Sequence, residues 1–339
     1  MSPKRPVKVS VVVPVYNEQA NLDEFFRRTL GVMDGLAGAY ELLLVDDGSR
    51  DRSLEILKAW AGRRPDVVRV LELSRNFGQH PAILAGFRDV TGDVIVTLDA
   101  DLQNPPEEIP KLLSKVEEGY DVVGGVRVSR QDSLPRRFAS LVVNRVTVAI
   151  TRMRLTDFGC MLRAYSRDVV DEINRTEEAA TFIPALGQSF ARNPTEIEVA
   201  HAPRTGGESA YSLYRLIRLN FDLMTGFSSV PLQLFGILGT FVALGGIAFG
   251  IFLFARRLIV GAEVEGVFTL FAILFTLLGI AMAGLGIVGE YVGRIYEQVR
   301  GRPRFSVRRA WGLRGEAPSG AGPKPAPTSA AEPSPAVRR

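Results

Sequence analysis

The sequence contains very little sulfur and imidazole. Its 339 residues include one cysteine, Cys160, and two histidines, His80 and His201. A single thiol excludes an internal disulfide framework and a cysteine-based zinc site. Because the two histidines lie far apart in sequence, a histidine-rich metal centre is excluded as well, and a histidine-based triad would have to use one of them.

The chain also has no large net charge of either sign. The 41 lysines and arginines nearly balance the 37 aspartates and glutamates, which leaves a formal net charge of +4. This total gives no electrostatic support to nucleic-acid binding. The first ten residues contain no apolar run, so we expect no secretory signal. Apolar residues nevertheless make up 46% of the chain and the mean hydropathy is +0.11, which is high for a wholly soluble protein.

The first half of the chain alternates short apolar runs with helical patterns. The apolar runs occupy residues 7–13, 41–45, 67–73, 93–98 and 121–125. Strands that alternate with helices predict an α/β fold with a mostly parallel, Rossmann-like sheet covered on both faces. Ligands of such sheets bind beyond the carboxyl ends of the strands. Polar clusters follow four of the predicted ends, at residues 16–18, 46–49, 74–76 and 99–101.

Two long uncharged runs, at about 230–255 and 266–289, distinguish the second half. Each is long enough to cross a bilayer, whereas buried core helices are seldom so long. We therefore predict a hairpin of two transmembrane helices within residues 230–290. Residues 206–229 mix apolar and charged side chains, which predicts an amphipathic juxtamembrane region at the interface.

Arginines concentrate after the second run. They are Arg294, Arg300, Arg302, Arg304, Arg308 and Arg309, against Arg256 and Arg257 in the hairpin loop. Because arginine-rich flanks stay in the cytoplasm, we expect residues 1–205, as the catalytic domain, and the C-terminus on that side. Residues 291–311 form a basic juxtamembrane segment. Residues 312–339 are rich in Pro, Ala, Gly and Ser without periodicity, so we expect a disordered tail.

The stretch LDADLQNPP, residues 98–106, places Asp99 and Asp101 at the end of a buried strand. A simple turn would account for the aspartates and prolines. A hard divalent cation, Mg²⁺ or Mn²⁺, is the alternative, because it takes oxygen ligands and often bridges to phosphates. Gln103 could supply a third oxygen, and the cation would offset the repulsion between the carboxylates.

A second acidic pair, Asp46 and Asp47, ends the neighbouring strand and is followed by Gly48 and Ser49. A strand-to-helix turn explains the pattern without a ligand. Acidic side chains at such strand ends also accept hydrogen bonds from a base and a ribose. One acidic pair for a nucleoside and one for a metal diphosphate together describe a sugar-nucleotide site.

Ten sequence blocks carry a family resemblance. Residues 11–22 (VVVPVYNEQANL), 43–53, 73–86 and 97–110 resemble the successive motifs of family 2 glycosyltransferases with the A-type (GT-A) fold. Residues 120–133, 157–171, 181–186, 207–217, 265–276 and 289–305 resemble the polyisoprenyl-phosphate glycosyltransferases of that family. The resemblance covers about residues 7–308.

The resemblance implies roles for individual residues. Pro14, Tyr16, Glu18, Asp46, Asp47 and Ser49 would line the uridine pocket, and Arg75, Asn76 and Asp99 would complete the nucleotide-sugar site. Asp99, Asp101 and Gln103 would hold the metal. Arg127, Arg136, Arg137 and Arg204 would meet the acceptor phosphate. Asp101, Arg127 and Asp157 would be the catalytic residues, with Asp157 at the junction of sugar and acceptor. Many relatives have Gly-x-Ser-Lys-Tyr where this chain has Ala210 in place of lysine, so Arg204 is the expected substitute.

The implied reaction is inverting transfer of a sugar from a UDP-sugar to undecaprenyl phosphate at the cytoplasmic face of a bacterial inner membrane. The subgroup matched by the motifs uses 4-deoxy-4-formamido-L-arabinose, for modification of lipid A or other envelope glycans, and its members form homotetramers. Transfer of glucose or mannose from UDP-glucose or GDP-mannose is the nearest alternative. A processive polysaccharide synthase would need a Gln-x-x-Arg-Trp signature, which residues 188–193 lack. A non-catalytic, membrane-anchored nucleotide-sugar-binding scaffold is the alternative from another class.

Overall fold

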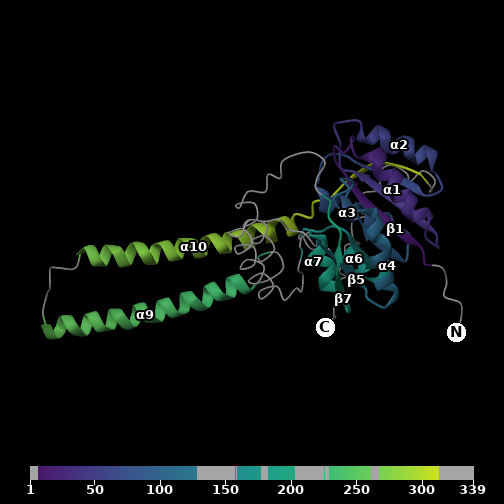
Figure 1. Cartoon of the computed structure of the whole chain (residues 1–339). Helices are drawn as coiled ribbons and strands as arrows, with labels where there is room; N and C mark the ends of the chain where they lie inside the picture. The colour runs from purple at the N-terminus through teal and green to yellow at the C-terminus, as the bar shows by residue number, and fades with distance from the viewer. Residues whose placement is uncertain are drawn as a thin grey trace, which may run out of the picture.

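The computed structural model describes residues 7–127, 157, 159–176, 182–202, 225, 229–260 and 267–312. The predicted amphipathic region 206–229 lies almost wholly outside these residues, as does the predicted tail after Gly312. Within the described part, an α/β domain carries a pair of long helices that project from it (Figure 1).

Eight strands of the described chain form one sheet in the order β7-β5-β6-β4-β1-β2-β3-β8. They are β1 (Val9–Val15), β2 (Tyr40–Asp46), β3 (Val68–Leu73), β4 (Val94–Thr97), β5 (Val122–Arg127), β6 (Arg163–Ser166), β7 (Pro194–Val199) and β8 (Val307–Trp311). Only β6 and β8 pair with their neighbours in the antiparallel sense. The predicted mostly parallel sheet is therefore confirmed, and six strands direct their carboxyl ends to one edge.

Helices cover both faces of this sheet (Figure 1). One face packs against α1 (Leu22–Asp34), α2 (Ser53–Arg63) and α4 (Ile109–Glu117), the last preceded by the 3₁₀ turn η1 (Pro106–Glu108). The other face packs against α3 (Gln79–Asp89), α6 (Arg167–Arg175) and α7 (Ile183–Phe190). Because the central strands are buried on both faces, they read as continuous runs of Val and Leu with no polar alternation.

The edge strand β8 was not predicted from the sequence. It comes from the basic segment that follows the second long helix, and it pairs antiparallel with β3. Trp311 packs partly against the core, with the Lys58 ammonium 4.3 Å from its ring centroid. Arg308 Nη1 lies 3.1 Å from Glu72 Oε1. The end of the predicted juxtamembrane segment is thus part of the eight-stranded sheet.

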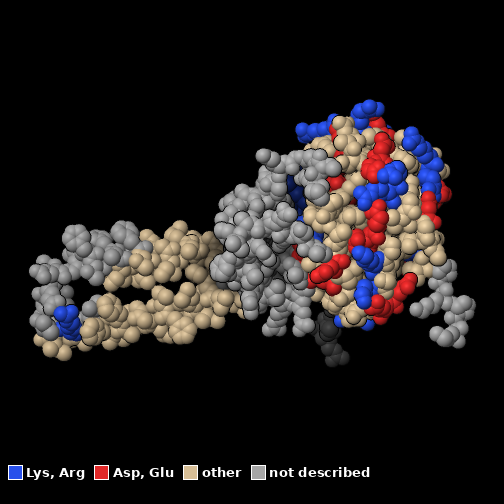
Figure 2. All heavy atoms as spheres, in the orientation of Figure 1, with Lys and Arg blue, Asp and Glu red and all other residues tan. Residues whose placement is uncertain are grey.

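The two long helices are α9 (Val230–Val260) and α10 (Val267–Val299). Their most apolar windows are Leu232–Phe252 and Thr276–Val299, with mean hydropathies of 2.1 and 1.5. Almost none of either window is buried, and in Figure 2 the visible described part of α9 carries charge only at its far end. Long apolar helices without a protein partner around them require a lipid environment, so the protein is membrane-anchored.

Candidate active site

The carboxyl ends of the parallel strands bring most of the predicted residues of the described chain to one edge of the sheet. Tyr16 follows β1, Asp47 follows β2, the 74–78 loop follows β3 and Asp99 follows β4. Arg127 ends β5. Asp157 joins them because it precedes β6, which runs in the opposite direction. The sequence-predicted cluster therefore assembles, apart from the three arginines outside the described residues: Arg136, Arg137 and Arg204.

Asp46 and Asp47 are both buried, with 1% and 2% of their surface exposed, yet they serve different purposes. Asp47 Oδ1 accepts from the Phe77 amide at 2.7 Å, and Oδ2 accepts from the Gly78 amide at 2.8 Å. Asp46 Oδ2 accepts from the Ser49 amide, whereas Asp46 Oδ1 is buried without a partner. Burial raises the pKa of both carboxyls. Both oxygens of Asp47 thus bond to the protein, whereas Asp46 keeps one acceptor oxygen without a partner.

The loops after β2 and β3 lie in direct contact. Gly48 has a φ of +70°, and a Cβ at this position would stand 2.7 Å from the Arg75 carbonyl carbon. Glycine is therefore required both by the left-handed backbone and by the close approach. Beside the loops, Arg75 and Asn76 are exposed, and Tyr16 is 41% exposed. These side chains are available to a ligand that enters from solvent.

The negative charge of the two carboxylates after β4 is only partly compensated by neighbouring groups of the protein. Asp99 Oδ1 accepts from Gln79 Nε2 at 2.5 Å. Burial raises the pKa of Asp99 to about 7, repulsion from Asp101 adds to the shift, and the Gln79 bond opposes it. Asp101 is half-exposed and accepts from the Gln103 amide at 3.1 Å. A cation between the strand end and a bound phosphate would satisfy this pair.

These residues fit Mg²⁺ or Mn²⁺ held in part by a substrate. In the described chain, no group of three or more His, Cys, Asp or Glu side chains converges as a closed metal site. Mg²⁺ commonly uses one or two protein carboxylates and completes its coordination with phosphate oxygens and water. Asp99 and Asp101, with the Gln103 amide oxygen, offer that donor set. Leu102, with a φ of +60°, turns the loop between them in a conformation that leucine seldom adopts.

Arg127 and Asp157 form a two-bonded ion pair at the opposite side of the site. Arg127 Nε donates to Asp157 Oδ2 at 2.7 Å, and Nη2 donates to Oδ1 at 2.8 Å. The Asp157 carboxylate raises the pKa of Arg127 above its usual value, and Asp99 acts in the same direction from farther away. The pair therefore lies within electrostatic range of the Asp99 carboxylate after β4.

Two further residues belong to this cluster that the sequence analysis did not assign. His201 lies just after β7; burial and the Arg127 charge lower its pKa, while the Asp101 and Asp157 carboxylates raise it. The adjacent Ala202 amide donates to the Gln103 carbonyl at 2.8 Å and holds the 99–103 loop against the end of β7. Their signal in the sequence was weak, because β7 has no continuous apolar run: only Ile197 and Val199 are apolar after its first residue, and glutamates alternate with them.

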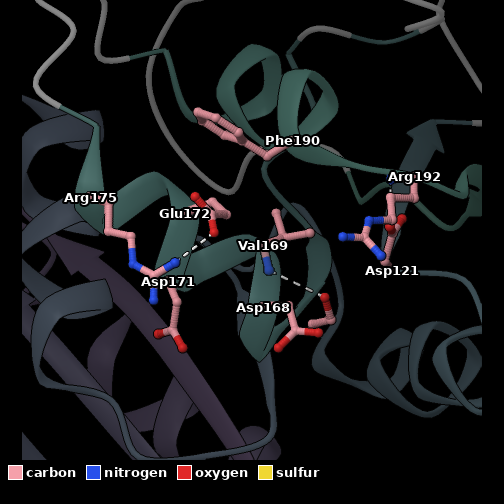
Figure 3. Close-up of a pocket in the computed structure, with 9 residues that line it drawn as sticks. Asp121, Asp168, Val169, Asp171, Glu172, Arg175, Phe190 and Arg192 are labelled. Atoms are coloured by element: carbon pink, nitrogen blue, oxygen red, sulfur yellow. Dashed lines mark hydrogen bonds and ion pairs between the residues drawn. The ribbon is translucent and has the colours of Figure 1, made fainter.

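A cavity of about 320 Å³ lies at the other edge of the sheet, lined mainly by α6 and the residues around Asp121 (Figure 3). Several of its acidic groups already have partners. Asp121 accepts from the Arg192 and Asn193 amides, and Glu172 pairs with Arg175 at 2.7 Å. This pocket is remote from the strand ends that collect the predicted residues.

Comparison with known proteins agrees with this geometry. Residues 10–173 match the glycosyl transferase family 2 domain. An undecaprenyl-phosphate 4-deoxy-4-formamido-L-arabinose transferase of Shewanella sediminis is 52% identical over 315 residues, which cover 92% of this chain and 95% of the relative. The chain belongs to glycosyltransferase family 2. This confirms the predicted family, its enzymatic class and its A-type fold.

Another relative of this glycosyltransferase has the same name and comes from Serratia proteamaculans. It is 50% identical over 92% of this chain and 97% of its own length. Among solved structures, the glycosyltransferase is similar to glucosyl-3-phosphoglycerate synthase from Mycobacterium tuberculosis, with a TM-score of 0.46 and 17% identity over 65% of this chain and 78% of that chain. The similarity to the sequence relatives thus extends across both long helices, beyond the family 2 domain.

Proposed function

We propose that this glycosyltransferase transfers 4-deoxy-4-formamido-L-arabinose from its UDP-linked form to undecaprenyl phosphate. One observation carries the proposal. The chain is 50–52% identical in sequence to relatives with that named activity, over nearly their full length and across both long helices. The assignment of individual residues rests on the geometry of the strand ends.

The donor nucleotide would bind across the ends of β1, β2 and β3. The unpartnered Asp46 Oδ1 supports this placement, because a buried acceptor without a donor suits the imide N–H of uracil. Tyr16 is exposed beside it, where its ring can contact the base or ribose. Pro14, Glu18, Ser49, Arg75 and Asn76 complete the proposed pocket.

Asp99, Asp101 and Gln103 would hold Mg²⁺ or Mn²⁺ with the donor diphosphate. The cation would offset the negative charge that develops on UDP as the leaving group. The raised pKa of Asp99 supports this role, because burial first, and repulsion from Asp101 second, disfavour its charged form, and a bound cation would offset both effects.

The nucleophile would be an oxygen of the acceptor phosphate, which is already anionic near neutral pH because the second pKa of a phosphate is about 6. No strong base is then needed, in keeping with a site that is poor in histidine. One C–O bond forms at the anomeric carbon as the bond to UDP breaks, and the centre inverts. The Arg127 guanidinium, oriented by its two hydrogen bonds to Asp157, would reduce repulsion between the acceptor phosphate and the donor diphosphate. Arg136, Arg137 and Arg204 are proposed to assist.

We further propose that α9 and α10 cross a bacterial inner membrane with the catalytic domain and C-terminus in the cytoplasm. The arginines after α10 support this orientation. A homotetramer is the expected assembly, which light scattering of the detergent-solubilised protein would check.

A donor panel tests the proposed activity. Purified protein in vesicles with undecaprenyl phosphate and Mn²⁺ is offered UDP-4-deoxy-4-formamido-L-arabinose, UDP-glucose and GDP-mannose, and released nucleotide is measured. We expect rapid UDP release from the arabinose donor alone. Turnover with GDP-mannose or UDP-glucose alone would replace the proposed sugar, and no release from any donor would favour a non-catalytic binding protein.

A further inference from the structure

Arg163, the first residue of β6, has the largest fully buried side chain among the described residues. None of its surface is exposed. Nε donates to the Cys160 carbonyl at 2.9 Å and Nη2 donates to the Asp157 carbonyl at 2.6 Å. Its Nη1 is buried without a partner, and the described residues provide it with no ion pair.

A buried guanidinium that makes no ion pair is costly, because a charge beyond contact distance offsets only part of its desolvation. A fold that needed only volume at this position could use methionine or leucine. The backbone also makes room for the guanidinium. A Cβ at Gly124, which pairs with Arg163 across β5 and β6, would lie 2.8 Å from its Nη1. Arg163 is therefore accommodated at a cost that packing does not explain.

The group that Arg163 holds is the short loop that carries Asp157. Two carbonyls three residues apart, those of Asp157 and Cys160, converge on one rigid planar fork. Above this fork, Asp157 Oδ1 accepts from the Gly159 amide at 2.9 Å and from Arg127. Gly159 leaves space for that arginine, because a Cβ there would stand 2.7 Å from Arg127 Nη2.

We propose that Arg163 is a positioning residue for the transfer reaction, which fixes the Asp157 loop from inside the core and so sets the direction of the Arg127 guanidinium toward the acceptor phosphate. The inference rests on the proposed function. It requires the fork geometry of arginine, because an ammonium group cannot hold two separated carbonyls in one plane.

Three variants test the inference. Arg163→Met removes both charge and fork, and Arg163→Lys keeps only the charge. Gly124→Ala keeps Arg163 but forces its Nη1 to move. Gly62→Ala, where a Cβ meets nothing within 4 Å, is the matched control. We measure kcat, KM for the UDP-sugar and UDP affinity by calorimetry, with kcat expressed per UDP-binding site so that unfolded protein does not count.

For Arg163→Met and Arg163→Lys we expect kcat to fall by about 10²-fold, the typical effect of a misplacement near 1 Å, with KM for the donor and UDP affinity within about twofold. Gly124→Ala is expected to lower kcat in the same direction, and the Gly62→Ala control should leave it unchanged. Wild-type kcat in Arg163→Lys would overturn the inference, because charge alone would then suffice. The inference would also be overturned if total activity fell only in proportion to the number of UDP-binding sites, because kcat per site would then be unchanged.

Hydrogen exchange separates this inference from the proposed function. If the wild-type chain transfers no sugar, the proposed function fails, and the exchange rate of the Gly159 amide still reports the loop. We expect faster exchange at Gly159 in Arg163→Met than in the wild type, with unchanged exchange along α2. Equal rates at Gly159 would overturn the positioning role, whatever the activity.

Discussion

Arg127 and Asp157 meet through two parallel hydrogen bonds of 2.7 and 2.8 Å, with only 20% and 5% of their side chains exposed. In Asp157→Asn the charge and one of the two acceptors are lost, so the guanidinium is no longer held in plane. We expect turnover to fall by about 10²-fold or more. UDP affinity should stay within about twofold because Asp46 lies on a different strand end, as calorimetry would check. A collapse of UDP affinity would instead place Asp157 in the donor site.

The two neighbouring aspartates should respond differently to the same substitution. Asp47→Asn replaces an acceptor of two backbone amides by a group with one acceptor, which should lower the free energy of unfolding by about 1–3 kcal/mol. Asp46→Asn should weaken UDP binding by about tenfold, because the unpartnered oxygen is the proposed ligand acceptor. Thermal unfolding and UDP titration measure the two effects. Equal effects of both variants would contradict this division of roles.

Removal of divalent cations should stop the proposed transfer. With EDTA we expect UDP release to cease, and either Mn²⁺ or Mg²⁺ should restore it. Asp101→Asn should lower turnover by about 10²–10³-fold in the presence of the cation, because the diphosphate loses its bound counter-charge. Glu117→Gln, in the exposed end of α4, is a control that should leave activity unchanged. Full activity of Asp101→Asn would exclude the residue from the metal site.

His80 gives the domain an acid-sensitive element. Its ring lies in the first turn of α3, 4.8 Å from the Phe182 ring centroid, and burial lowers its pKa to about 4. In the unfolded chain the histidine pKa is about 6.5, so the unfolded state binds the proton more tightly than the folded state. The stability that comes from burying neutral His80 is therefore fully present above pH 6.5 and is lost as pH falls toward 4. Between these two limits the free energy of unfolding should fall by about 3 kcal/mol through this histidine.

Substitution of this histidine isolates its part of the acid response. His80→Gln cannot titrate, so its stability should fall less steeply between pH 6.5 and 4 than that of the wild type. Thermal unfolding followed by fluorescence of Trp60 and Trp311 reads this difference. Parallel curves for the two proteins would show that His80 is not the source of the acid sensitivity.

The edge strand β8 should contribute to stability through its tryptophan and hardly through its ion pair. Trp311→Ala removes a ring packed against the core and should cost about 1.5–3 kcal/mol. Arg308→Ala is the control, because its side chain is 62% exposed and such pairs contribute about 1 kcal/mol or less. Denaturant unfolding compares the two variants. A larger loss for Arg308→Ala would reverse the assignment.

The sequence predicted the first five strands well because apolar residues dominate each strand and most of their side chains are buried. Strand β6, with the sequence RAYS, and strand β7, with the sequence PTEIEV, carry no comparable pattern. Strand β8 lies after a long apolar helix and has mostly exposed side chains, so its pairing with β3 depends on a tertiary contact that local sequence does not encode.

The site shows the same division. Asp99, Asp101 and Asp46 follow predicted strands, so topology alone brings them to one edge. The inward commitment of Asp47 was not predictable, because it depends on the conformation of the Phe77–Gly78 turn. Neither His201 nor Arg163 was assigned to the site from the sequence, since each lies on or beside a strand whose pattern was too weak to predict.

The link between α10 and β8 has a kinetic consequence. Residues 300–306 alone separate the helix from the strand, and seven residues reach at most about 25 Å when fully extended. Strand β8 pairs with β3, whose end carries the Arg75 loop, so a short segment next to that loop connects the sheet to the membrane anchor. A polyprenyl acceptor diffuses in the same plane, and encounters are two-dimensional. The turnover rate should then depend on the mole fraction of acceptor in the membrane. It should not change when the vesicles are diluted with buffer at constant membrane composition.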